Sequence, residues 1–305
     1  MVWSLEDEKL NKLFVSKNPE DVLKFYSYFN TTEHLIAWSR RRPHGRAKIY
    51  EVDGDKEIVV VIPTADYNGE YAKTCRENIF KGLQIVFVES GGRDDPYFNY
   101  ARNCNFALRR ALNYNPKWII LSNDDIYKID EFSNLLMELS KLNNKNYDTV
   151  FINSTPDNHH FEAIHIIKYG FLDKIVLSKI KKNARVLENL RDKYRINYGI
   201  TGLKTIKSLV RLLLFSQIVR FINVGDFSIF SSDFIRKNGP KIFDEIFING
   251  YEDIYLSFLL NKSKRFLRVN FSLGSYVGSF LGLSKSRALR SVFNQAYFNY
   301  LFNLE

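Results

Sequence analysis

The pattern of apolar and polar residues changes near residue 50. Before that point, apolar residues recur at helical spacing over Leu10–Phe14 and again over Val22–Phe29. A basic stretch containing Pro and Gly, residues 40–45, then interrupts the pattern. The sequence therefore predicts an N-terminal helical extension over residues 1–50.

Short, continuous apolar runs dominate the next hundred residues. Runs of this kind, rich in β-branched side chains, are typical of strands buried on both faces of a parallel sheet. Helical patterns lie between them, at residues 71–80 and 101–112. This alternation predicts an α/β fold with a doubly wound sheet. The runs are Glu57–Ile62 (which Pro63 is expected to stop), Leu83–Val88, Trp118–Leu121 and Thr149–Ile152.

Polar residues follow three of these predicted strands. They are Pro63-Thr64, Glu89-Ser90 and Asn123-Asp124-Asp125. Ligands of doubly wound sheets bind beyond the carboxyl ends of the strands, so we expect these residues to lie close together. Adjacent carboxylates offer the oxygen ligands that Mg²⁺ or Mn²⁺ prefers. Read alone, Asn-Asp-Asp also fits a turn in which Asp caps a helix.

Five segments, in order along the chain, resemble motifs of glycosyltransferase family 2. The resemblance covers about residues 57–160 and 223–300, and it implies the GT-A fold over residues 57–305, with a doubly wound mixed sheet. The segments are IVVVIPT (58–64), VFVESGG (86–92), YARNCN (100–105), IILSNDDI (119–126), and GDFSIFS (225–231) taken with FDEIFINGYEDIYL (243–256).

On the donor side, the resemblance implies a site for a nucleotide-sugar. Pro63, Thr64 and Ala65 would line the pocket for the base and ribose. Glu89 takes the place of the acid, more often Asp, that contacts the nucleoside.

The resemblance also implies contacts to the phosphates and to a metal ion. Arg102 and Asn103 would close over the base and phosphates, although Arg102 alone also fits a solvated residue of a first helical turn. Asn123-Asp124-Asp125 stands in for the Asp-x-Asp motif of the family, with Asn123 beside the nucleotide. Asp125 would be the first ligand of Mn²⁺ or Mg²⁺, and Asp124 would bind the ribose or the metal and its water.

On the acceptor side, the resemblance implies roles for Glu252 and Asp253. Asp253 would act as the general base that removes the proton of the acceptor hydroxyl, with inversion at the anomeric carbon, while Glu252 orients a saccharide or lipid-linked acceptor. Acids in a first helical turn are also favoured by the helix dipole without any catalytic role. No histidine follows Asp253, so water and diphosphate oxygens would complete the metal shell.

The net charge of +10 is concentrated in one segment. Residues 161–222 hold thirteen Lys/Arg against four Asp/Glu, a net +9, and their periodicity predicts a basic helical insertion with an apolar face over 206–222. Such an insertion can lie on an anionic membrane surface or pack as an acceptor-side subdomain. No nucleic-acid-binding motif accompanies it, so we expect no nucleic-acid partner.

Other features bear on the compartment and on competing functions. Cys75 and Cys104 make no disulfide framework, and no signal segment or long apolar run is visible, so we expect a cytoplasmic protein, peripheral to a membrane if the insertion binds one. The alternatives are a polyprenyl-phosphate sugar transferase, a sugar-phosphate nucleotidyltransferase and a non-catalytic membrane-surface module. Residues 63–69 hold one glycine, which disfavours the triphosphate loop of a nucleotidyltransferase.

Overall fold

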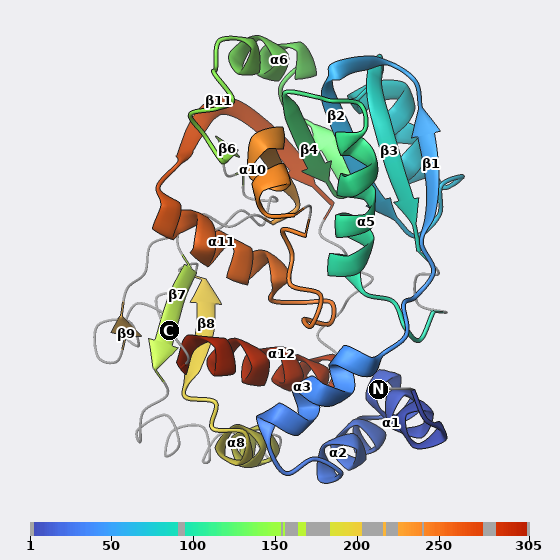
Figure 1. The fold of residues 1–305 in the computed structure, drawn as a ribbon, viewed down its shortest axis with the longest axis vertical. Helices are drawn as coiled ribbons and strands as arrows, with labels where there is room; N and C mark the ends of the chain where they lie inside the picture. The colour runs from blue at the N-terminus through green and yellow to red at the C-terminus, as the bar shows by residue number, and fades with distance from the viewer. Residues whose placement is uncertain are drawn as a thin grey trace.

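A computed structural model defines the fold of most of the chain (Figure 1). It describes residues 3–90, 95–153, 155, 164–168, 184–202, 216–217, 225–239, 241–276 and 285–303.

The centre of the molecule is a mixed sheet of eight strands in the order β1-β3-β2-β4-β10-β6-β11-β5. Strands β3, β2 and β4 run parallel, whereas β10 is antiparallel to both of its neighbours, β4 and β6. The predicted α/β class with a mixed sheet is thus confirmed. The strands are β1 (Lys48–Val52), β2 (Asp55–Thr64), β3 (Leu83–Glu89), β4 (Trp118–Ser122), β5 (Ile126–Lys128), β6 (Thr149–Asn153), β10 (Phe227–Ser231) and β11 (Phe266–Ser275).

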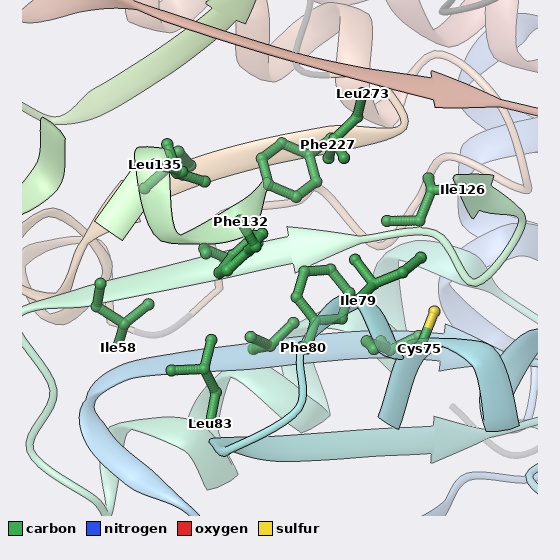
Figure 2. Close-up of a cluster of buried hydrophobic side chains, with 14 of the residues drawn as sticks. Ile58, Cys75, Ile79, Phe80, Leu83, Ile126, Phe132, Leu135, Phe227 and Leu273 are labelled. Carbon is green, nitrogen blue, oxygen red and sulfur yellow. The ribbon is translucent and has the colours of Figure 1, made fainter. Parts of the chain in front are cut away.

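Helices cover both faces of this sheet, which explains why its central strands are apolar on both sides. Alternate residues of β2 face opposite layers: Val60 packs with α4 (Glu70–Thr74) and α6 (Phe132–Ser140), and Val61 packs with α5 (Tyr100–Leu112). Figure 2 shows the first of these layers, where Phe80 and Phe132 meet edge to face with ring centroids 5.1 Å apart. The second layer also includes α10 (Ser232–Lys237) and α11 (Glu252–Ser263).

Two local predictions need correction. Strand β2 continues through Pro63 to Thr64, because β4 pairs with β2 only as far as Val61 and Pro63 lies beside β3 alone. The helix predicted over residues 71–80 is a short α-helix, α4, followed by a π-helical turn at Cys75–Ile79.

The N-terminal extension is helical as predicted, but its boundary differs. Its helices are α1 (Leu5–Val15), α2 (Pro19–Ser27) and α3 (Thr32–Arg41), and Ser4, Asn18 and Thr31 cap them with side-chain oxygens. The helical part therefore ends at Arg41, and β1, which begins inside the predicted extension, is an edge strand of the main sheet.

The C-terminal helix α12 (Lys285–Asn303) packs against this extension, away from the centre of the eight-stranded sheet. It contacts α2, α3 and α8 (Ala184–Lys193) at the end of the molecule away from β3 and β4 (Figure 1). Buried residues from all of these helices form one apolar cluster, with Trp38 of α3 and Phe293 of α12 at its centre. The two ends of the chain thus build a single helical layer.

The basic insertion contains strands where we predicted helix. Strands β7 (Ile164–Lys168), β8 (Tyr198–Gly202) and β9 (Ser216–Gln217) form a separate three-stranded sheet, so a helix does not run unbroken over 206–222. The apolar and basic positions that predicted it, such as Ile206 and Lys207, lie outside the described residues. In the described part, Leu190 of α8 is buried against the N-terminal helices, as in a packed subdomain.

No helix in the described part of the chain is long and apolar enough to cross a membrane.

Candidate functional site

The candidate site lies at one edge of the main sheet, where β2 and β4 end and β10 begins. Strands β2 and β4 are parallel, so Thr64 and Asn123 leave the sheet at the same edge. Strand β10 runs the other way with Phe227 opposite Ser122, which brings the preceding residue, Asp226, to Asn123. The backbone N–H of Asn123 donates to the carbonyl of Asp226 at 2.8 Å.

Asn123 connects two parts of this edge through its side chain. Its amide nitrogen donates to Asp226 Oδ1 at 3.1 Å, and its amide oxygen accepts from the hydroxyl of Tyr100 at 3.2 Å. Both ends of the amide thus contact protein groups, and Asn123 fixes the edge of the sheet to the first residue of α5.

Asp124 is held by Thr64, another residue of the predicted donor site. The Thr64 hydroxyl donates to Asp124 Oδ2 at 2.6 Å. Burial raises the pKa of Asp124, and this hydrogen bond to its carboxylate opposes the rise. The structure therefore brings Thr64 and Asp124 together, as the sequence predicts.

Asp125 lies among other acids. Burial raises its pKa to about 6, and the carboxylates of Asp226 and Asp124 add to the effect. Its backbone carbonyl accepts from the N–H of Tyr276 at 2.8 Å. The backbone is thus fixed while the carboxylate faces like charge.

Sequence reasoning missed Asp226. Its Oδ1 binds Asn123, but its Oδ2 is buried without a hydrogen-bond partner among the described residues. An unpaired carboxylate oxygen inside a protein is costly, which points to a cation or a donor that completes it. The sequence feature that could have identified Asp226 is its position directly before a buried apolar strand, β10.

These carboxylates fit a divalent cation, although they do not enclose one. No group of three or more His, Cys, Asp or Glu able to hold a metal occurs within the described ranges. Mg²⁺ commonly takes one or two carboxylates and completes its shell with water and substrate phosphates. The unpaired oxygen of Asp226 and the nearby carboxylate of Asp125 are the protein groups that could bind such a cation.

Glu252 and Asp253 approach the same edge from the N-terminus of α11. The carboxylate of Glu252 accepts from the backbone N–H of Gly250 at 2.6 Å, and Glu252 is only 6% exposed. Burial raises the pKa of both acids; the charge of Asp253 adds to the rise at Glu252, and the charge of Asp226 adds to it at Asp253. The charge of Asp226 therefore acts on both Asp125, the predicted metal ligand, and Asp253, the predicted base.

Glu89 and the residues before α4 lie along the same edge. Thr64 is the neighbour of Glu89 in the paired strands β2 and β3, and Glu89 Oε2 accepts from the N–H of Tyr67 at 2.8 Å. Pro63 is half-buried and Ala65 is exposed. The predicted base and ribose residues are thus brought together beside the acids.

Arg102 and Asn103 contact a different part of the protein. The guanidinium of Arg102 donates to the carbonyls of Pro43 and Arg42 at 2.9 and 3.2 Å, and its side chain is 12% exposed. Asn103 donates to the carbonyl of Arg46 at 3.3 Å. Both side chains tie α5 to residues 42–46, so Arg102 must give up these bonds before it can reach a phosphate.

No protein-family model matches this chain, and no curated protein matches it.

Proposed function

We propose that this chain is an inverting glycosyltransferase with the GT-A arrangement, which moves a sugar from a nucleotide-sugar to an acceptor hydroxyl. The observation that carries the proposal is the convergence of acids from three distant segments at one sheet edge. Asp124 and Asp125 follow β4, Asp226 precedes β10, and Glu252-Asp253 begins α11. The charge of Asp226 acts on both Asp125 and Asp253.

The parallel half of the sheet supports a nucleotide-sugar on the donor side. Thr64, Glu89 and Asn123 stand at or just beyond the carboxyl ends of β2, β3 and β4, where doubly wound sheets bind nucleotides. Asp125 and Asp226 would hold Mn²⁺ or Mg²⁺ there. Such a cation would supply positive charge for the diphosphate leaving group.

The raised pKa of Asp253 supports its role as the general base. An ordinary Asp is a weak base, and burial beside like charge makes its carboxylate a better proton acceptor near neutral pH. In the proposed reaction, Asp253 takes the proton of the acceptor hydroxyl as its oxygen attacks the anomeric carbon. The bond from that carbon to the diphosphate oxygen breaks on the opposite face, which inverts the configuration.

A thermal-shift panel tests the proposal. Nucleoside diphosphates and nucleotide-sugars of all common bases are added to the full chain with and without Mn²⁺, because a ligand of the native state raises the melting temperature by mass action. The expected result is a shift for one base that requires Mn²⁺ and is absent in Asp125→Asn. The full chain is then incubated with the nucleotide-sugar of that base, and release of a nucleoside diphosphate supports sugar transfer. In a second reaction it is given a sugar phosphate and a nucleoside triphosphate, and formation of pyrophosphate indicates a nucleotidyltransferase. No Mn²⁺-dependent shift with any base contradicts the proposal.

A further inference from the structure

The turn that delivers Glu252 and Asp253 to the site has an unfavourable backbone conformation. Two of its non-glycine residues have positive φ angles, 53° at Asn249 and 74° at Tyr251. The left-handed region disfavours side chains other than those of Gly, Asn and Asp, so the Tyr251 conformation costs energy and must be held by its surroundings.

Side chains from distant elements hold the segment that leads into this turn. Four consecutive carbonyls, at residues 245 to 248, each accept a hydrogen bond from a side-chain donor. Asn99 binds the carbonyls of Glu245 and Phe247 at 3.0 and 2.9 Å, Ser39 binds that of Ile246 at 3.1 Å, and Asn294 binds that of Ile248 at 2.9 Å. The segment is thus fixed by side chains where no helix or strand satisfies its backbone.

Among the hydrogen bonds to these four residues, those of Asn294 lie nearest in the chain to the acids. It accepts from the N–H of Ile248 at 2.8 Å and donates to the carbonyl of the same residue at 2.9 Å, so one buried amide fixes both backbone groups. A side chain at position 250 would place its Cβ 3.2 Å from the Asn294 amide nitrogen, which is closer than an ordinary van der Waals contact. Glycine at position 250 therefore lets the turn approach Asn294 closely. The N–H of that glycine in turn holds the carboxylate of Glu252.

Two residues on one face of α12, Asn294 and Phe298, contact the turn or the residue that leads into it. Phe298 lies one helical turn beyond Asn294 on the same face, and its ring meets that of Tyr251 edge to face with centroids 5.8 Å apart. Helix α12 is itself packed against the N-terminal helices. The helical layer formed by both chain ends thus reaches the candidate site through these two residues.

We propose that Asn294 is a positioning residue for Asp253, a role that rests on the proposed function. It does not touch substrate. By fixing Ile248 it sets the backbone of residues 249–251, and through that backbone it sets where Glu252 and Asp253 enter the site.

Asn299 on the same helix provides a matched control. It is buried, and its amide accepts from the N–H groups of Asn197 and Tyr198 and donates to the carbonyl of Tyr198. Asn294→Ala and Asn299→Ala therefore remove the same kind of buried amide from one helix, but only the first contacts the turn.

The test measures hydrogen exchange and turnover in the full-length variants. Asn294→Ala should speed amide exchange in a peptide spanning residues 249–256, whereas Asn299→Ala should speed it near residues 197–198. With the nucleotide-sugar selected by the thermal-shift panel, Asn294→Ala should lower the rate of donor hydrolysis about tenfold or more and leave the KM for the donor unchanged, because a misplaced base slows chemistry without weakening donor binding. Asn299→Ala should stay within about twofold of the wild-type rate.

Two results would overturn the positioning role. One is unchanged exchange over residues 249–256 in Asn294→Ala, and the other is an equal loss of turnover in both variants. A wild-type chain that neither transfers nor hydrolyses any nucleotide-sugar contradicts the proposed function instead, and the exchange data still decide whether Asn294 fixes the turn.

Discussion

Asp226 Oδ1 accepts a hydrogen bond from the side-chain amide of Asn123 at 3.1 Å, although the two residues are 103 positions apart in the sequence. The pairing of β10 with β4 creates this contact. It leaves Asp226 Oδ2 buried and without a partner in the described structure, beside Asp125 and within the electrostatic reach of Asp253. The relationship makes Asp226 the residue whose substitution is most informative.

Asp226→Asn should keep the hydrogen bond from Asn123, because the amide oxygen can still accept, while the negative charge is lost. We expect Mn²⁺-dependent nucleotide binding to weaken by about tenfold or more. Isothermal titration calorimetry with the nucleoside diphosphate from the panel measures this. Asp233→Asn, which removes a partly exposed acid on α10, is the control and should bind normally. Unchanged Mn²⁺ dependence in Asp226→Asn would remove this residue from the metal site.

Asp125→Asn should stabilise the metal-free protein at neutral pH. Its folded pKa, about 6, lies above the ordinary value of 3.8, so ionisation of Asp125 favours unfolding. This destabilisation is absent below the unfolded pKa, grows as pH rises between the two values, and is complete above about 6. After allowance for solvent screening, the expected gain is about 1 to 2 kcal/mol at pH 7 and none near pH 3.5.

Denaturant melts of wild type and Asp125→Asn across that pH range, without added metal, provide the measurement. The same variant should lose the Mn²⁺-dependent thermal shift. If the difference in free energy of unfolding between the two proteins does not change with pH, the folded state does not raise the pKa of Asp125.

Asp253→Asn keeps the size of the side chain and removes its basicity. Turnover should fall by about a hundredfold or more, and donor affinity should hardly change. In the wild type, the rate should fall as pH decreases through the pKa of Asp253. Because burial and the charge of Asp226 raise that pKa, the fall should begin at a higher pH than for an ordinary carboxyl group. Near-normal turnover in Asp253→Asn would move the base elsewhere, with Glu252 the next candidate.

Much of the sheet, and the grouping of residues where β2, β3 and β4 end, could be predicted because local sequence specifies them. Strands buried on both faces give continuous apolar runs, so the predicted cores of β2, β3, β4 and β6 all appear in the structure. The rule that ligands bind at the carboxyl ends of such strands then grouped Thr64, Glu89 and Asp124 correctly.

The remaining features depend on contacts between distant segments, which periodicity does not reveal. Asp226 joins the site only because β10 is inserted antiparallel beside β4. Strands β7 to β9 pair across an insertion whose apolar spacing suits a helix. Asn294 binds the backbone of Ile248, 46 residues earlier in the chain, and no sequence motif around Asn294 indicates this contact.

Arg102 separates a structural role from a phosphate-binding role. Its guanidinium is mostly enclosed and bonded to the carbonyls of Arg42 and Pro43, with Glu245 Oε2 3.8 Å from its Nε. Arg102→Met should therefore leave two partly buried carbonyls and a partly buried acid without this partner, and lower the free energy of unfolding by about 2 to 4 kcal/mol. Arg109→Met is the control, because this half-buried arginine of the same helix lies over the exposed ring of Phe106, and it should change stability by less than about 0.5 kcal/mol. Urea melts and nucleotide titrations on both variants decide between the roles. If Arg102→Met keeps the stability of the wild type but loses nucleotide affinity, the guanidinium leaves these carbonyls to bind phosphate, as the resemblance to glycosyltransferase family 2 implies.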